Sequence, residues 1–204
     1  MRLFIAIPIE EEIKESLVKF QKQLKATQAD IKLVQPDNIH MTLRFLGEVD
    51  EKVVPSIIEI MKKAVSGYQS FEAELKGIGG FPTVSSPRVV WVGYRELLNT
   101  YKTKQIYEKI ENGLVGLGLA PDAHSFSPHI TIARVKSSKS PLNPPLLRGV
   151  GGMSGLLKEE SDFNAGTQAI KEVILFQSQL QPTGAVYSMV YSAVLDVITP
   201  VGTS

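Results

Sequence analysis

Cysteine is absent from the chain, which excludes disulfide bonds and thiolate chemistry from its function. A sequence without cysteine suits a reducing compartment, and we expect a cytoplasmic protein. No apolar run approaches the roughly 20 residues that a membrane-spanning helix needs. The apolar stretch at residues 1–9 is about one strand long and lacks the features of a signal peptide. We therefore expect no membrane association.

An excess of either charge is also absent, since 22 basic residues face 21 acidic ones and the net charge is +1. A protein that coats long stretches of nucleic acid usually carries a basic face, so this balance argues against that class. Binding to one nucleotide or to one strand end stays open. Of the 204 residues, 43% are hydrophobic and 21% charged, which is typical of a globular protein. We expect a single domain over residues 1–204.

Histidine is scarce, yet two of the three histidines share one four-residue frame of His, apolar, Thr, apolar. The copies are His40-Met41-Thr42-Leu43 and His129-Ile130-Thr131-Ile132. They lie 89 residues apart (129 − 40), one in each half of the chain. Because a strand turns successive side chains to opposite faces, His and Thr share one face while the apolar residues enter the core. Each half is therefore expected to present one imidazole and one hydroxyl.

Periodic apolar patterns predict both strands and helices. The predicted strands cover residues 3–7, 31–34, 39–46, 71–78, 88–94, 129–135, 170–177 and 186–197, and the predicted helices cover 10–24, 50–65 and 97–119. Helices do not alternate with single strands, so this order argues against a doubly wound parallel sheet. We predict an α+β fold with antiparallel sheets, in which two pseudo-symmetric lobes each carry one motif strand.

One segment, residues 137–162, is rich in proline and glycine and too long for a tight connection in a compact domain. We interpret it as a flexible insertion. The alternative is a lid that holds RNA through Lys136, Lys139 or Arg148.

Two histidines on opposite sides of a phosphate provide general acid–base catalysis. Neutral imidazole removes a proton from water and imidazolium donates one to a leaving oxygen, and both forms exist near neutral pH. A cyclic phosphodiester suits this pair, with Thr42 and Thr131 as candidate donors to its non-bridging oxygens. Either of two arginines could hold the phosphate. Arg44 is in phase with His40 in a regular strand, whereas Arg134 needs a bulge or the end of the strand to turn it inward. Either arginine could instead face water.

A metal site is the competing interpretation of two histidines. A catalytic zinc normally takes three protein ligands, yet no carboxylate shares a strand face with either motif and His124 lies close before His129. We therefore expect no metal and no cofactor, with His124 structural or facing solvent. Trp91 is expected in the core or at its rim. Phe45 is expected in the core because it falls on the face opposite His40.

Three segments closely resemble the bacterial and archaeal RNA 2′,3′-cyclic phosphodiesterases, first called 2′-5′ RNA ligases, of the two-histidine phosphoesterase superfamily. They are Arg2-Leu3-Phe4-Ile5-Ala6-Ile7, Asn38-Ile39-His40-Met41-Thr42-Leu43-Arg44-Phe45-Leu46-Gly47 and Ser127-Pro128-His129-Ile130-Thr131-Ile132-Ala133-Arg134. Further landmarks are Gly80-Phe81-Pro82, Arg88-Val89-Val90-Trp91-Val92-Gly93 and Gly184-Ala185-Val186-Tyr187. The chain departs from the family pattern at Leu33, where the family often has an aromatic residue.

The resemblance implies a bilobal fold with a central cleft and helices outside, and metal-free hydrolysis of terminal 2′,3′-cyclic phosphates to 2′-phosphates. It implies that His40 is the proton donor and His129 the proton acceptor. It also implies that Thr42, Thr131 and Arg134 contact the phosphate. The expected partners are RNA 3′ ends or small cyclic nucleotides, bound by a monomer.

Two alternatives to hydrolysis stay open. The same site run in reverse would join RNA ends through a 2′-5′ linkage, although water favours hydrolysis. A binding module without turnover would hold a nucleotide or an RNA end, but it would not require two proton-transfer groups.

Overall fold

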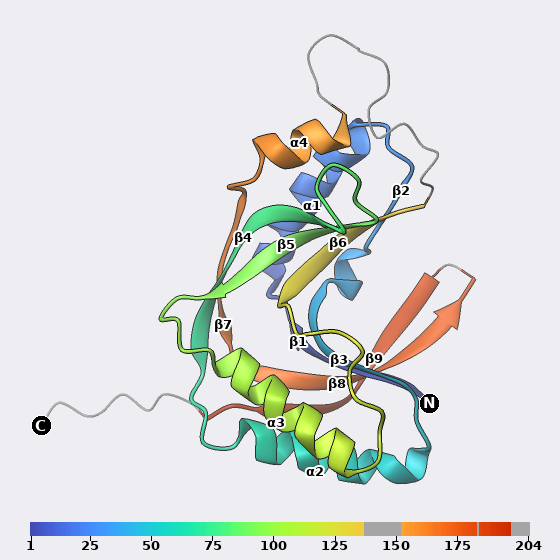
Figure 1. The fold of residues 1–204 in the computed structure, drawn as a ribbon, viewed down its shortest axis with the longest axis vertical. Helices are drawn as coiled ribbons and strands as arrows, with labels where there is room; N and C mark the ends of the chain where they lie inside the picture. Colours follow the sequence, from blue (N-terminus) through green and yellow to red (C-terminus); the bar gives the residue numbers. More distant parts are fainter. Residues whose placement is uncertain (137–151, 183, 197–204) are drawn as a thin grey trace, which may run out of the picture.

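Antiparallel strands and four α-helices build the computed structural model, which describes residues 1–136, 152–182 and 184–196 (Figure 1). The strands are β1 (Arg2–Pro8), β2 (Ile31–Leu33), β3 (His40–Glu48), β4 (Phe71–Phe81), β5 (Val89–Glu96), β6 (His129–Val135), β7 (Asn164–Ile170), β8 (Glu172–Gln181) and β9 (Gly184–Val194). The helices are α1 (Glu11–Ala26), α2 (Val54–Val65), α3 (Lys102–Gly116) and α4 (Met153–Glu159), with short 3-10 helices η1 (Pro36–Asn38) and η2 (Glu51–Val53).

The strands form one curled sheet in the order β7-β4-β5-β6-β3-β1-β8-β9, with β2 added beside β6. Four strands, ending at β6, make one half, and four strands, beginning at β3, make the other. The halves join where β3 pairs with β6, and the only residues in register there are Met41 and Ile130. This arrangement confirms the predicted α+β fold with antiparallel strands, and shows that both halves share a single sheet.

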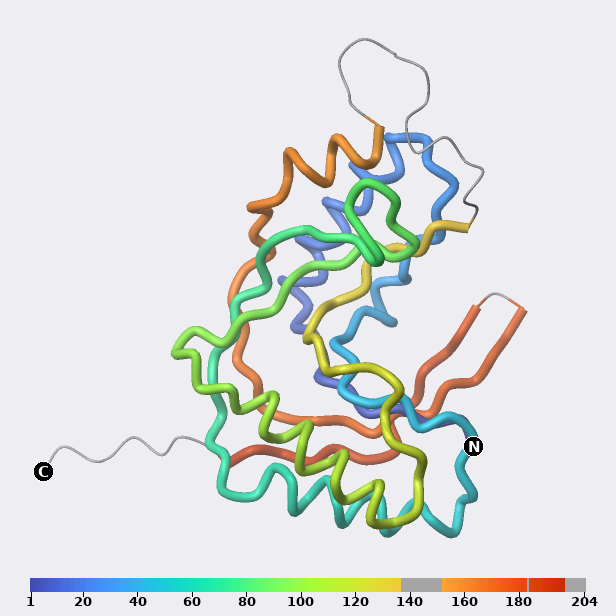
Figure 2. Tube along the Cα trace, viewed as in Figure 1, coloured from blue at the N-terminus to red at the C-terminus, as the bar shows by residue number. Residues whose placement is uncertain are grey.

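Helices cover the outer side of each half (Figures 1 and 2). Helix α1 packs against β6 and β7, whereas α2 and α3 pack against each other and against β8, β9 and β3. The apolar positions of α1 recur at helical spacing and are buried at Ile13, Leu17, Phe20 and Leu24. Acidic Glu11 and Glu12 occupy its first turn, where the helix dipole favours negative charge. None of the helices among the described residues is both long and apolar enough to cross a membrane.

The third predicted helix begins five residues later than the apolar spacing indicates, at Lys102 instead of residue 97. The carboxylate of Glu96 accepts hydrogen bonds from the backbone N–H of Lys102, at 2.9 Å, and of Thr103, at 2.7 Å. These bonds satisfy amide groups that a helix start leaves unpaired, and so they fix where the helix begins. The preceding loop exposes Leu98, and Tyr101 has a positive φ of 53°.

Two elements that the sequence patterns did not predict follow the segment at residues 137–151, which lies outside the described residues together with Lys139 and Arg148. Helix α4 falls within the predicted insertion at 137–162 and buries Met153, Leu156 and Leu157. Strand β7 pairs with β4 along its length and forms one end of the sheet. The part of the predicted insertion from Met153 onward is therefore packed against the core.

Trp91 lies half-buried over the backbone of β4, where it faces Gly79 as its partner in the register. A Cβ atom on Gly79 would come within 2.1 Å of the Trp91 ring. The absence of a side chain at this position therefore leaves the space that the indole ring occupies beside the neighbouring strand.

We predict that Gly79→Ala lowers the free energy of unfolding by about 1–3 kcal/mol, because the indole must move out of the space that the new methyl group takes. Urea unfolding followed by the fluorescence of Trp91, the single tryptophan, measures this change. The matched control is Gly116→Ala at the end of α3, where a Cβ meets nothing within 4 Å. The packing argument fails if Gly79→Ala is as stable as this control.

Candidate active site

The two motif strands meet at their motifs. Met41 and Ile130, the pair that joins β3 to β6, are both fully buried and point into the core. Residues directly opposite in an antiparallel pair share a face, and their neighbours along each strand point to the other face. The polar side chains of both motifs therefore lie on one side of the sheet, which we call the histidine face. They are His40, Thr42, His129 and Thr131.

Both motif strands carry a bulge just after the threonine. In β3, Ile5 pairs with Arg44 and Ala6 with Thr42, so one extra residue, Leu43, interrupts the alternation. In β6, Val90 pairs with Ala133 and Trp91 with Thr131, so Ile132 is the extra residue. A bulge of this kind shifts every later side chain to the opposite face. The two halves thus repeat both the motif and its irregularity.

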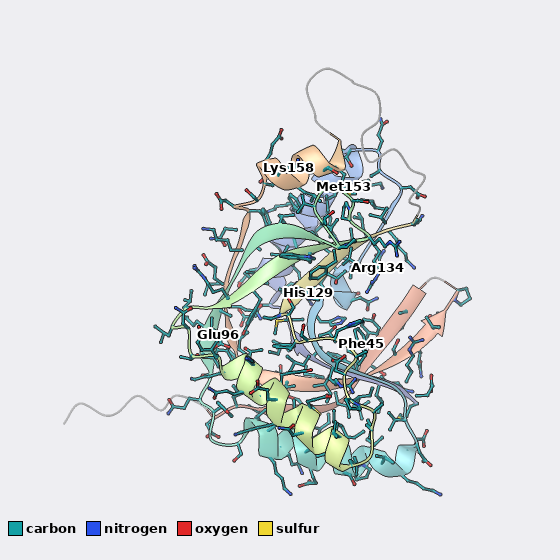
Figure 3. All side chains as sticks on the ribbon, in the orientation of Figure 1. Phe45, Glu96, His129, Arg134, Met153 and Lys158 are labelled. Carbon is teal, nitrogen blue, oxygen red and sulfur yellow. The ribbon has the colours of Figure 1, made fainter. Side chains whose placement is uncertain are left out.

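The bulges decide which of the two arginines reaches the histidine face. Arg134 is exposed on that face, because the bulge in β6 turns it there. Arg44 is buried, because the bulge breaks the regular alternation that would have kept it in phase with His40. The expectation that Phe45 is a core residue is wrong for the same reason, since its side chain is 60% exposed. Figure 3 shows His129 and Arg134 in the half above and Phe45 in the half below.

Arg44 instead forms a buried ion pair that ties β3 to α3. Its Nε donates to the carboxylate of Glu111 at 2.6 Å, and Asp122 lies 3.9 Å away. Its terminal nitrogens donate to the carbonyl oxygens of Phe45, at 2.6 Å, and Ala120, at 2.5 Å. The guanidinium is thus fully engaged in holding structure, and it is turned away from the motif side chains.

Each histidine is held in the same way by a carbonyl two residues earlier. His40 Nδ1 lies 2.8 Å from the carbonyl oxygen of Asn38, and His129 Nδ1 lies 2.7 Å from that of Ser127. A carbonyl oxygen only accepts, so Nδ1 of each ring carries the proton. The other ring nitrogen, Nε2, is then the atom that can take up or deliver a proton. Both imidazoles are therefore oriented for acid–base chemistry through Nε2.

The surroundings of the two rings differ. His40 packs against Phe4, with ring centroids 4.9 Å apart, and against the edge of Tyr187, at 5.4 Å. This burial lowers the pKa of His40 to about 4, and the positive charge of Arg134 adds to the effect, while the bond to Asn38 opposes it. His129 contacts Phe81 edge-on, with centroids 5.1 Å apart. At neutral pH the free protein therefore holds His40 in its neutral form.

Two residues that the sequence analysis did not single out support this geometry. The side-chain amide of Gln21 in α1 donates to the carbonyl oxygens of Val34 and of the bulge residue Ile132, both at 2.8 Å. The side-chain amide of Asn38 donates to Ala185 on β9, also at 2.8 Å. The sequence did contain a sign of the role of Gln21, because this polar residue falls among the apolar positions that form the buried side of α1.

His124 is exposed in the loop before β6, apart from both motifs. Within residues 1–136, 152–182 and 184–196, no three or more His, Cys, Asp or Glu side chains gather in a group that could hold a metal ion.

Comparison with known proteins identifies relatives over nearly the whole chain. The family model described as LigT like Phosphoesterase matches residues 7–91 and 100–187. An RNA 2′,3′-cyclic phosphodiesterase of Thermotoga maritima is 35% identical over 94% of this chain and 94% of its own. An RNA 2′,3′-cyclic phosphodiesterase of Methanocaldococcus jannaschii is 34% identical, and the match covers 93% of this chain and 98% of that protein.

Solved structures share the fold. The structure of TT0787 of Thermus thermophilus has a TM-score of 0.75 and 28% identity, and the match covers 96% of this chain and 98% of that one. The structure of E. coli LigT complexed with 3′-AMP has a TM-score of 0.71 and 25% identity, and the match covers 95% of this chain and 97% of that one.

We predict that Arg44→Met lowers the free energy of unfolding by about 3 kcal/mol, because it leaves the half-buried carboxylate of Glu111 without its cationic partner. The comparison variant is Arg134→Gln, which removes an exposed charge from the histidine face and should leave stability within about 0.5 kcal/mol. Chemical denaturation of both variants measures the difference. Equal stability of the two variants would contradict the assignment of Arg44 to structure.

The pKa of His40 also predicts how stability changes with pH. In the unfolded chain the imidazole of His40 takes up a proton near pH 6.5, whereas in the folded protein it takes up a proton only near pH 4. Stability should therefore fall as the pH drops through this window, by up to about 3 kcal/mol from this group. Denaturation of the wild type and of His40→Gln at several pH values isolates the contribution, with His124→Gln as control. An identical pH slope in wild type and His40→Gln would show that His40 is not buried in its neutral form.

Proposed function

The chain belongs to the LigT-like phosphoesterases, and from this premise we propose that it hydrolyses terminal 2′,3′-cyclic phosphates of RNA to 2′-phosphomonoesters without a metal ion. The observation that carries the proposal is the pair of imidazoles on one face, each with Nδ1 bound to a carbonyl and Nε2 left for proton transfer. Both come from one chain, which favours a monomeric enzyme. The cysteine-free composition suits a cytoplasmic location.

In the proposed reaction, the oxygen of a water molecule attacks phosphorus and the bond from phosphorus to the ribose 3′ oxygen breaks. His129 Nε2 accepts the proton that the water loses, and His40 Nε2 donates a proton to the departing 3′ oxygen. The product keeps its phosphate on the 2′ oxygen. The hydroxyls of Thr42 and Thr131 donate to the non-bridging oxygens, where negative charge accumulates, and Arg134 adds a positive charge.

The donor role requires His40 to gain a proton that it lacks in the free protein, where its pKa is about 4. A bound phosphodiester supplies the reason for this change. Its negative charge favours the imidazolium form, and it also pairs with Arg134, whose charge otherwise disfavours that form. We therefore propose that the substrate itself prepares the proton donor, so that His40 is charged mainly when a phosphate is in place.

The test is an RNA oligonucleotide that ends in a 2′,3′-cyclic phosphate, incubated with the protein in EDTA. We expect a 2′-phosphomonoester product, identified by chromatography against 2′- and 3′-phosphate standards. His40→Ala and His129→Ala should each lower the rate by about 10²–10⁴-fold, because each removes one proton-transfer group. His124→Ala is the control and should keep full activity.

Undiminished turnover by either motif variant would refute the proposed chemistry. Tight binding of the oligonucleotide without turnover at any pH would instead indicate a binding module.

A further inference from the structure

Two cations lie side by side on neighbouring strands next to the motif side chains. Lys32 on β2 is the register partner of Arg134 on β6. Directly opposed residues of antiparallel strands share a face, so Lys32 lies with Arg134 on the histidine face. Both residues are exposed. In Figure 1, β2 runs beside the end of β6, and Figure 3 marks Arg134 at that end.

This pair of like charges is unfavourable for the free protein. Like charges directly opposite each other in a sheet repel and destabilise the pairing. Among the described residues, neither Lys32 nor Arg134 forms an ion pair with a carboxylate. The next basic residue, Lys136 just past the end of β6, does form one, because Asp30 lies 3.8 Å from its ammonium group. Lys32 and Arg134 therefore form a positively charged site next to the motif residues, and a bound anion would neutralise it.

The position of Lys32 separates it from the phosphate that reacts. Arg134 and Thr131 pair with Val89 and Trp91 on β5, so they lie two strand positions apart, or about 7 Å along the strand. Lys32 lies one strand spacing to the side of Arg134, about 5 Å further from β5. Arg134 is therefore nearer than Lys32 to the motif threonine. It can contact both the reacting phosphate and a second phosphate of the same strand, whereas Lys32 can contact only the second phosphate.

The position in the other half that corresponds to Arg134 carries no charge. Phe45 occupies the position in β3 that corresponds to Arg134 in β6, three residues after the motif threonine and just past the bulge. The pseudo-symmetric halves thus differ at this point, with a cation pair on one side and an exposed aromatic ring on the other. A phosphate chain that leaves the motif residues along β6 toward β2 therefore meets two neighbouring cations, Arg134 and Lys32.

We propose that Lys32, together with Arg134, binds the phosphodiester immediately 5′ of the terminal cyclic phosphate. This inference rests on the proposed function and adds to it a preference for RNA strands over cyclic mononucleotides. The reacting phosphate lies at the histidines, and the internal phosphodiester lies between the two opposed cations. A cyclic mononucleotide has no second phosphate, so it leaves Lys32 unused.

The experiment compares two substrates, 2′,3′-cyclic AMP and a trinucleotide that ends in a 2′,3′-cyclic phosphate, in wild type and Lys32→Gln. For the trinucleotide, we expect kcat/KM to fall about fivefold in the variant, through KM, because one charged contact is lost. The slope of log kcat/KM against log salt should become shallower by about 0.7. For the cyclic mononucleotide, kcat/KM should not change.

Two control variants make the result specific. Lys32→Arg keeps the charge and should keep the preference for the trinucleotide. Lys62→Gln on α2 removes the same charge from a solvent-exposed ion pair with Glu59, and should affect neither substrate. Thermal unfolding should show Lys32→Gln to be at least as stable as wild type, because the substitution relieves repulsion by Arg134.

An equal loss on both substrates would place Lys32 at the reacting phosphate and overturn the proposal, as would no loss on either. If the wild type turns over neither substrate, the proposed function fails, but the second site is still tested. In that case, a trinucleotide with a terminal 2′-phosphate should bind more weakly to Lys32→Gln than to wild type, while 2′-AMP binds both equally. Equal trinucleotide binding by wild type and variant would refute the second site.

Discussion

The pairing of Met41 with Ile130 is the contact on which the candidate site depends, because it is where the two halves of the described sheet are in register with each other. Burial of these two apolar side chains fixes the opposite face as the one that carries the motif side chains. A slip of one residue in either strand would turn its histidine into the core and its apolar neighbours out. The free energy of core packing therefore enforces the geometry that acid–base chemistry needs.

The two halves of the sheet share some features of the candidate site and differ in others. The repeated motif and the repeated bulge give both halves an imidazole held through Nδ1, which is the shared requirement for moving two protons. The residues just past the bulges differ, so the two sides of the candidate site differ in charge. Arg134 places a charge on one side, and Phe45 places a ring on the other. The aromatic packing around His40 adds a further difference, because burial lowers the pKa of this imidazole in the free protein.

The motif geometry was predictable because alternation along a strand is a local property, so His40 and Thr42 could be placed on one face without knowledge of the partner strand. Arg44 and Phe45 could not be placed, because a bulge exists only in relation to the register of the neighbouring strand. Similarly, the true start of α3 depends on the carboxylate of Glu96, a residue held at the end of β5 by pairing with β4. Helix α4 was missed because Gly155 and the breaker-rich residues before it hide its short apolar stripe.

The central claim is that both histidines share one bound phosphate, and a nuclear magnetic resonance titration of their imidazole protons tests it most directly. In the free protein, the pKa of His40 should be about 4. With 2′-AMP bound, we predict that the signals of His40 and His129 both shift and that the pKa of His40 rises toward neutrality, because the phosphate charge stabilises the imidazolium. A His40 pKa that stays near 4 in the complex, or a His129 signal that does not respond, would contradict the account.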